Sequence, residues 1–157
     1  MKLHILAVGN KMPDWITSAF GEYEKRMPRE ARMELREIRP ERRDSGKSVQ
    51  QIQEIEASRV NAAMPHNAFR VILDEKGDQL STMEFAGCVV RWMQEGRDAA
   101  FVIGGADGTH PDLREKADRV ISLSKMTLPH GLARVMLAEQ IYRAVSIINH
   151  HPYHRDG

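Results

Sequence analysis

Apolar and polar positions along the chain follow two periods, one typical of strands and the other typical of helices. Short apolar runs, such as LHILAVG at 3–9 and AAFVIGG at 99–105, are typical of buried strands. Longer segments between them carry apolar residues at helical spacing. We expect strands at 3–9, 33–38, 69–74, 99–105 and 119–124, and helices at 14–27, 48–64, 81–94 and 131–149. Strands that alternate with helices predict an α/β domain with a mostly parallel sheet flanked by helices.

Two of the predicted helices begin with a capping box, in which a serine and a residue three positions later satisfy each other's backbone N–H. Ser48 and Gln51 have this spacing, and so do Ser81 and Glu84. A chain of 157 residues fits one domain. No repeat, linker or low-complexity segment divides it, so we expect residues 1–157 to form a single domain.

Composition and charge exclude several classes of protein. No apolar run reaches the roughly 18 residues needed to span a bilayer, and the apolar core of MKLHILAVGNKMPDW is too short for a signal peptide. Cys88 is the only cysteine, which excludes an internal disulfide. We therefore expect a cytoplasmic protein without a membrane partner. The net charge is only +1, so a nucleic acid would have to bind a local basic patch.

Candidate ligand-binding residues lie where predicted strands end, because ligands of open parallel sheets bind at the carboxyl ends of the strands. In FVIGGADG, Gly104 and Gly105 allow a ligand to approach the backbone, although a plain turn explains them equally well. The sequence GGADG is neither GxGxxG nor a P-loop, which disfavours an ordinary Rossmann enzyme. In SLSKMTLPHG, the loop can offer backbone groups to a heterocycle while Met126 and Leu128 cover its face. A simple strand–helix connection, in which Pro129 sets the entry angle of the helix, is the alternative.

Four blocks of sequence resemble one known family: LHILAVGNKMPDW at the start, then LDEKG and FVIGGADG, and LSKMTLPHGLARVMLAEQIYRAVSIINHHPYHR at the end. The chain resembles the SPOUT-class, trefoil-knotted methyltransferases, and within them the ribosomal RNA large subunit methyltransferase H family. The resemblance covers essentially the whole chain. It implies methylation of ring nitrogen 3 of a pseudouridine in 23S ribosomal RNA within the ribosome, with S-adenosylmethionine as the cofactor.

The resemblance also implies a fold and a cofactor site. The C-terminal segment would thread through a loop to form a deep trefoil knot, and the protein would act as a homodimer. The knot loops would form the S-adenosylmethionine pocket from the matching positions Leu73, Gly104, Gly105, Leu123, Ser124, Lys125, Met126, Thr127 and Leu128. We expect Gly105→Val to abolish cofactor binding in a folded protein, because a branched side chain would fill space reserved for the ligand.

The C-terminal sequence NHHPYHRDG concentrates reactive side chains in the last nine positions. A metal site is disfavoured, because Cys88 is distant and Pro152 prevents His151 and His154 from sharing one regular helix. We therefore expect no metal. The family resemblance implies instead that this tail lies beside the cofactor, at the dimer interface, and faces the RNA.

Four residues are candidates for catalysis. Arg155 can stabilise the negative charge that spreads over a uracil-type base when its ring nitrogen loses a proton. His154 or His130 can accept that proton, because imidazole titrates near the working pH. Tyr153 can stack on the extruded base, as aromatic residues do in the recognition of unpaired RNA.

Two further features concern partners. Apolar residues of the last helix that lie off its main stripe predict a twofold homodimer that buries them (Leu132, Leu137, Tyr142 and Ile147). Residues 25–47 hold nine Lys or Arg against five acids, a local charge of +4. A patch that binds RNA and a solvated charged face explain this stretch equally well.

Two other classes of function stay open. A non-catalytic RNA- or ribosome-binding module would contact RNA without affinity for the cofactor. A nucleotide-binding hydrolase would use GGADG as an anion-binding loop, but the chain lacks both a P-loop lysine and a nucleophile motif. Calorimetric titration with S-adenosylmethionine separates the three hypotheses.

Overall fold

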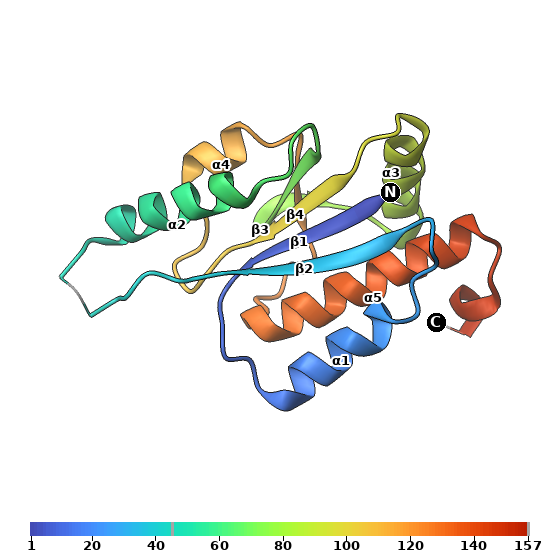
Figure 1. Ribbon diagram of the computed structural model, residues 1–157, viewed down its shortest axis with the longest axis horizontal. Coiled ribbons are helices and arrows are strands. Elements are labelled where there is room, and N and C mark those ends of the chain that lie inside the picture. The colour runs from blue at the N-terminus through green and yellow to red at the C-terminus, as the bar shows by residue number, and fades with distance from the viewer. Residues whose placement is uncertain (45, 157) are drawn as a thin grey trace.

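The centre of the protein is a sheet of five strands in the order β2-β1-β4-β3-β5. The computed structural model describes residues 1–44 and 46–156 (Figure 1). The strands are β1 (Lys2–Val8), β2 (Arg32–Ile38), β3 (Phe69–Gln79), β4 (Ala99–Ile103) and β5 (Arg119–Ser122). Every pair of neighbouring strands is parallel, so all five carboxyl ends lie at one edge of the sheet.

Helices cover both faces of the sheet (Figure 1). On one face, α1 (Asp14–Glu24), α3 (Thr82–Gln94) and α5 (His130–Ile148) pack around the larger core cluster. On the other face, α2 (Val49–Ala63) and α4 (Pro111–Glu115) pack around a smaller cluster. A 3-10 helix, η1 (Pro152–Asp156), follows α5. The predicted α/β class, with a parallel sheet flanked by helices, is confirmed. Across the described residues, no helix has the length and apolar character needed to cross a membrane.

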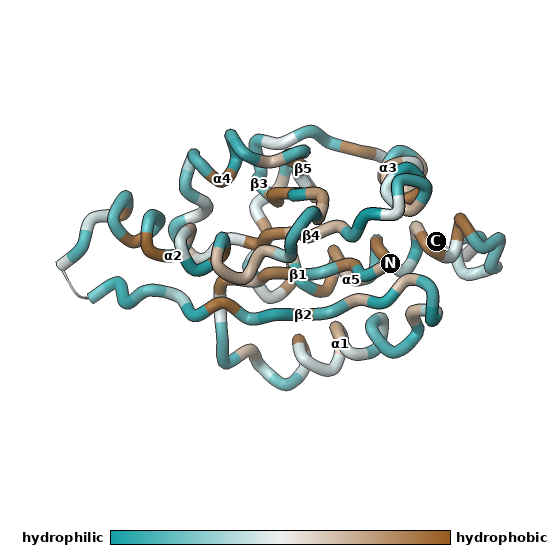
Figure 2. Tube along the Cα trace, turned by 45° about the horizontal axis from the view of Figure 1, so that its top comes forward, coloured by the Kyte–Doolittle hydropathy of each residue, from teal (hydrophilic) through white to brown (hydrophobic). Residues whose placement is uncertain are grey.

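Burial explains why β1 and β4 occupy the centre of the sheet. Leu3 and Ile5 are buried in the larger cluster, and Leu6, which points to the opposite face of β1, is buried in the smaller one. Every residue of β4 is buried. Strands covered on both faces need such continuous apolar runs, whereas an edge strand does not. Figure 2 shows hydrophilic colour along most of β2, which forms one edge of the sheet.

Both predicted capping boxes are confirmed. The Ser48 hydroxyl accepts a hydrogen bond from the Gln51 backbone N–H at 3.1 Å, and the Gln51 side chain accepts one from the Ser48 N–H at 2.8 Å. Ser81 and Glu84 exchange the same two bonds, at 3.1 and 2.9 Å. These contacts satisfy N–H groups that a helix start otherwise leaves without a partner.

The end of β3 differs from the prediction, which ended this strand at residue 74. Leu73 and Asp78 both pair with Ile121, so residues 74–77 bulge away from β5 before pairing resumes. Gly77 permits this close approach, because a Cβ there would lie 2.8 Å from backbone atoms of Ile121. Two short elements were not predicted at all. The helices α4 and η1 have five residues each, too few to display a helical period.

The outward face of α5 differs in part from the expectation. Leu137 and Tyr142 are buried in the chain's own core, so the prediction that they belong to a surplus apolar surface is wrong. Leu132 and Ile147 are partly exposed, and so is Met136. Their spacing places these three residues along one stripe of α5.

Candidate functional site

The bulged middle of β3 and the carboxyl ends of β4 and β5 surround a cavity of about 440 Å³. Most of the positions predicted to bind the cofactor line it: Leu73, Gly104, Gly105, Leu123, Ser124, Met126, Thr127 and Leu128. The remaining position, Lys125, is exposed and lies outside the lining. His130, a candidate for catalysis, also lines the cavity. Three segments that are far apart in sequence therefore converge on one site.

Hydrogen bonds fix the shape of the loop between β5 and α5. The Ser122 hydroxyl donates to the Ser124 carbonyl at 2.8 Å, and the Ser124 hydroxyl accepts from the Met126 N–H at 2.9 Å. The Thr127 hydroxyl donates to the Glu75 carboxylate at 3.1 Å, which ties the loop to β3. The Met126 side chain is 78% exposed. Hydrogen bonds made by the hydroxyl groups, rather than packing of the Met126 side chain, therefore hold this part of the wall.

The loop after β4 needs glycine because it folds back closely on itself. A Cβ on Gly104 would lie 2.8 Å from the Thr109 methyl group and 3.1 Å from the Gly108 carbonyl carbon. Gly108 has a φ of +76°, which favours glycine, and its N–H donates to the Gly105 carbonyl at 3.0 Å. The backbone itself thus forms the wall of the cavity at this point.

The free side of Gly105 faces the interior and α2 rather than the cavity. A Cβ there would lie 3.2 Å from a Val8 methyl group and 3.3 Å from a Glu56 carboxylate oxygen. The expectation that a branched side chain would fill the ligand's space is therefore wrong, since it would press on Val8 and Glu56. Glu56 is buried and accepts a hydrogen bond from the Glu41 N–H at 3.0 Å. Burial raises the pKa of Glu56, against the opposing effect of that hydrogen bond.

Two carboxylates give the cavity a negative side. Asp74 and Glu75 both line it, directly after the buried part of β3. Asp74 pairs with Arg114 at 3.5 Å, and Glu75 accepts the bond from Thr127. Sequence reasoning missed both residues as site residues, although two acids at the end of a buried strand were a usable signal. Such a wall favours a cationic group over an anion.

His130 is held between two partners at the start of α5. Its Nδ1 lies 2.9 Å from the Gly104 carbonyl oxygen, and its Nε2 lies 2.9 Å from Nε of Arg134. Burial lowers the pKa of His130, the bond to Gly104 opposes this, and the charge of Arg134 adds to the lowering. The imidazole is therefore neutral at neutral pH. The part played by Arg134 was not predicted.

Comparison with known proteins identifies the family. A family model described as "Predicted SPOUT methyltransferase" matches residues 1–154. The chain is 57% identical over 155 residues to the ribosomal RNA large subunit methyltransferase H of Paraburkholderia xenovorans strain LB400, covering 99% of each chain. Proteins of the same name from Paraburkholderia phymatum and Nitrosospira multiformis are each 56% identical with the same coverage. The chain belongs to the ribosomal RNA large subunit methyltransferase H family of SPOUT methyltransferases. This family implies the trefoil knot, and SPOUT methyltransferases generally use S-adenosylmethionine.

The C-terminal tail of this SPOUT methyltransferase packs back on α5. The Tyr153 ring meets the Tyr142 ring edge-on at 4.7 Å between centroids, and the Arg143 guanidinium lies 4.8 Å from the centroid of Tyr153. Arg143 also pairs with Glu139 at 2.8 Å. Burial raises the pKa of Tyr153 to about 12, helped by the Glu139 charge and by Tyr23. The phenol is therefore un-ionised at neutral pH.

The other two tail candidates are less constrained. Arg155 is exposed. Nδ1 of His154 is buried and has no hydrogen-bond partner within the described structure, and the His151 Nδ1 accepts from the Tyr153 N–H at 3.2 Å. Next to the packed Tyr153 ring, the tail thus exposes the Arg155 cation and holds the His154 imidazole partly buried.

One chain does not bring the four catalytic candidates together. His130 is the first residue of α5, whereas Tyr153, His154 and Arg155 follow its last turn. A helix of 19 residues is roughly 28 Å long at about 1.5 Å per residue. Figure 1 shows the start of α5 near the middle of the molecule and the C-terminus at the right, with the length of α5 between them. Within this chain, the cavity and the tail are therefore separate.

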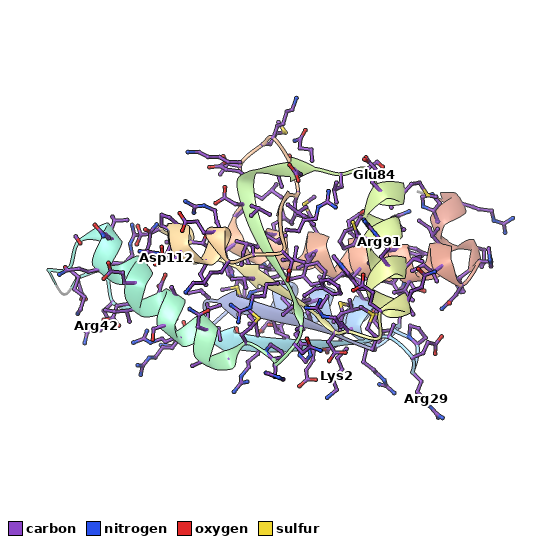
Figure 3. The ribbon with its side chains drawn as sticks, turned by 90° about the horizontal axis from the view of Figure 1, so that it is seen from above. Lys2, Arg29, Arg42, Glu84, Arg91 and Asp112 are labelled. Atoms are coloured by element: carbon purple, nitrogen blue, oxygen red, sulfur yellow. The ribbon has the colours of Figure 1, made fainter. Side chains whose placement is uncertain are left out.

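The basic stretch at 25–47 divides into paired and unpaired cations. Five of its nine basic residues form ion pairs with nearby acids: Lys25 and Arg26 with Glu22, Arg42 with Asp44, Arg43 with Asp107, and Lys47 with Glu41. In the portion of the chain that is described, no ion pair involves the exposed residues Arg29, Arg32, Arg36 and Arg39. Figure 3 shows Arg29 and Arg42 extending outward at opposite ends of the molecule. Ser45 lies outside the described residues.

Among residues 1–44 and 46–156, no three or more metal-ligating side chains gather into a group that could hold an ion.

Proposed function

We propose that this SPOUT methyltransferase transfers the methyl group of S-adenosylmethionine to ring nitrogen 3 of a pseudouridine in 23S ribosomal RNA, on the assembled ribosome. The observation that carries the proposal is the convergence of the family's cofactor positions on one cavity. The names of the relatives support ribosomal RNA as the substrate. An enzyme that acts on ribosomes would work in the cytoplasm.

The residues around the cavity fit S-adenosylmethionine. When bound, this cofactor supplies a methyl group carried on a positively charged sulfur. The cavity volume of about 440 Å³ lies within the range of roughly 300–1,000 Å³ that is typical of small-molecule sites. The carboxylates of Asp74 and Glu75 favour a cation on their side of the cavity. The backbone of Gly104 and of residues 123–128 offers hydrogen-bonding groups for the polar atoms of the cofactor.

The tail would act on the RNA base. When ring nitrogen 3 loses its proton, negative charge spreads onto the neighbouring carbonyl oxygens. Arg155 would stabilise this charge with a forked pair of hydrogen bonds, and Tyr153 would stack on the base. His154 would accept the proton directly or through water. His130 is the alternative acceptor, but its Nε2 lone pair already accepts a bond from Arg134.

The separation along α5 supports a homodimer with composite sites. A twofold dimer that pairs the two α5 helices antiparallel would bring the tail of one subunit to the cavity of the other. The partly exposed stripe with Leu132, Met136 and Ile147 offers apolar surface for such pairing. Light scattering at micromolar concentration tests the assembly, and a stable monomer would remove the composite site.

Methyl transfer to ribosomes from a strain that lacks the enzyme tests the reaction. Arg155→Ala should lower the rate by about 10²–10³-fold, as loss of one group that stabilises developing charge does in other enzymes. Its affinity for S-adenosylmethionine should stay at the wild-type value. Arg91→Ala, which removes an exposed arginine of α3, is the matched control and should keep the full rate. A full rate in Arg155→Ala would contradict the assignment of the tail, and ribosome binding without cofactor affinity would favour a non-catalytic module.

Mixed dimers test the composite site directly. Protein lacking residues 153–157 keeps its cavity, whereas Leu128→Trp keeps its tail but places a bulky ring on a residue that lines the cavity. Each variant alone should be inactive, and calorimetry should show that only Leu128→Trp has lost cofactor affinity. Co-expressed subunits should recover activity, because each mixed dimer pairs one intact cavity with one intact tail. No recovery from verified mixed dimers would show that tail and cavity do not cooperate between subunits.

A further inference from the structure

Four segments that are distant in sequence meet at the first turn of α5. The His130 Nδ1 lies 2.9 Å from the Gly104 carbonyl oxygen at the end of β4. The Arg134 Nε lies 2.9 Å from Nε2 of His130, and the Arg134 Nη1 lies 2.8 Å from a Glu37 carboxylate oxygen at the end of β2. Gly9, which follows β1, packs against both side chains. Three hydrogen bonds thus form one chain from β2 to the wall of the cavity.

The chemistry of the partners fixes the protonation of His130. A carbonyl oxygen only accepts hydrogen bonds, and a guanidinium nitrogen only donates them. The His130 Nδ1 must therefore carry the proton and donate it to Gly104, while Nε2 keeps a lone pair and accepts from Arg134. Arg134 also donates to Glu37. Every bond of the chain has a single possible direction, so the imidazole cannot switch tautomer without breaking a bond.

Burial leaves these side chains little freedom. Arg134 is 2% exposed, although its partner Glu37 keeps 45% of its side chain exposed. A buried cation without an acceptor would be strongly destabilising, so the bond to Glu37 retains it in place. A Cβ on Gly9 would lie 3.1 Å from both Arg134 Nη2 and His130 Nε2. The backbone at Gly9 therefore packs closely against the side chains of His130 and Arg134.

We propose that His130, held by Arg134 and Glu37, is a positioning residue that fixes the Gly104 peptide in the wall of the cofactor cavity. The proposal rests on the proposed function in one respect, namely that the cavity binds S-adenosylmethionine. In a trans peptide the C=O and the following N–H point in opposite directions, so the bond to the Gly104 carbonyl also sets the direction of the Gly105 N–H. A wall that is ordered before the ligand arrives binds it with a smaller entropic cost.

The same geometry separates positioning from proton acceptance. The only lone pair on the neutral His130 ring is at Nε2, and it faces a buried guanidinium. Accepting a proton there would break the bond to Arg134 and leave two cations in contact. A general base at this position would therefore act against its own surroundings, whereas a fixed donor to Gly104 is supported by them.

Two substitutions at position 130 test the proposal. His130→Asn offers an amide N–H that can replace Nδ1 as the donor to Gly104, whereas His130→Phe keeps a ring and removes both bonds. Calorimetry should show S-adenosylmethionine affinity about tenfold weaker in His130→Phe, equivalent to ~1.4 kcal/mol. His130→Asn should recover most of that loss. The single-turnover rate at saturating cofactor should fall less than about tenfold in both, since removal of a general base costs about 10²–10⁴-fold. Wild-type cofactor affinity in His130→Phe, or loss of rate without loss of affinity in both variants, would overturn the proposal.

A second experiment perturbs the chain of hydrogen bonds at Glu37, away from the cavity. Glu37→Gln should weaken cofactor affinity a few-fold without touching the cavity. Glu34→Gln is its matched control, because Glu34 lies on the same strand and forms an ion pair with Lys2 at 3.4 Å. The control should bind the cofactor like wild type. Equal behaviour of the two variants would contradict the link between Glu37 and the cavity wall.

The nitrogen NMR spectrum of His130 tests for the chain of hydrogen bonds in protein without any ligand. The wild type should show a proton on Nδ1 and none on Nε2, and Arg134→Met should shift His130 toward a mixture of tautomers. A proton on Nε2 in the wild type would overturn the proposal. If wild-type protein bound no S-adenosylmethionine, the proposed function would fail. These spectra would still show whether the chain of hydrogen bonds through His130 exists. Thermal unfolding of each variant identifies any that does not fold, and Glu37→Gln, at a half-exposed site, keeps the proposal testable in that event.

Discussion

Gly77→Ala measures how closely β3 packs around β5 beside the cavity. A Cβ on Gly77 would lie 2.8 Å from the carbonyl carbon of Val120 and from two backbone atoms of Ile121. Backbone atoms cannot rotate away as a side chain can, so the two strands must separate. Such overpacking costs about 1–3 kcal/mol, and we expect the upper end because all three contacts are rigid. The substitution also removes unfolded-state entropy, which offsets about 0.4–1 kcal/mol.

The net loss should therefore be about 2 kcal/mol, which lowers the thermal midpoint of a chain of this length by about 4–8 °C. Equilibrium unfolding in urea, followed by the fluorescence of the buried Trp92, measures it. Cofactor affinity should fall as well, because Leu73 and Asp74 of the same strand line the cavity.

Gly87→Ala is the control for this substitution. It adds the same methyl group within α3, where the described residues place no atom within 4 Å of the new Cβ apart from its chain neighbours and the nearby backbone of the helix itself. Because alanine is favoured over glycine by about 1 kcal/mol inside a helix, Gly87→Ala should stabilise the protein. The close packing of β3 on β5 would be contradicted if Gly77→Ala were as stable as wild type. It would also be contradicted if both variants lowered the free energy of unfolding by the same amount.

Three further outcomes are expected. Spectrophotometric titration should show one phenol that ionises near pH 12, and Tyr153→Phe should remove it. The folded-state pKa of this phenol exceeds the unfolded value of about 10. The stability that the neutral phenol contributes at lower pH should therefore be lost as the pH rises through 12. Replacing Arg32 and Arg36 by Gln should reduce the slope of log ribosome affinity against log salt by about 0.7–0.9 for each phosphate that the protein no longer neutralises, whereas Arg26→Gln, whose cation pairs with Glu22, should change it little. Buried Cys88 should react with a thiol reagent far more slowly in native protein than in urea, and equal rates would contradict its burial.

The sequence predicted features whose signals are local. Ser48 with Gln51 and Ser81 with Glu84 were recognisable because a capping box needs only four consecutive residues. The order of strands and helices followed from apolar periodicity in the same way. The cofactor positions came from the family resemblance, and the glycine pair at the end of β4 was visible without it because only glycine tolerates such close backbone contact.

Non-local contacts could not be predicted in this way. The resumption of β3 at Asp78 depends on pairing with Ile121, and the polar segment EKGDQ carries no alternating pattern that indicates it. The direction of the missing Cβ at Gly105 depends on how β1 and α2 pack behind the loop. Arg134 bonds to a carboxylate 97 positions earlier in the chain. A signal was present, because Arg134 occupies a core position of α5, three and four residues before the buried Leu137 and Ala138, where a charge needs a partner.

The length of α5 links the fold to the reaction. Its N-terminal end contributes His130, held by Arg134, to the cavity wall, and nearer its C-terminal end Tyr142 packs against Tyr153 of the tail. A straight helix of 19 residues cannot bring these two ends together. Charge that develops on a base during methyl transfer can be stabilised only by groups within hydrogen-bonding distance of it. A tail that takes part in catalysis must therefore come from a second subunit, so loss of dimerisation should abolish methyl transfer while each cavity keeps its affinity for the cofactor.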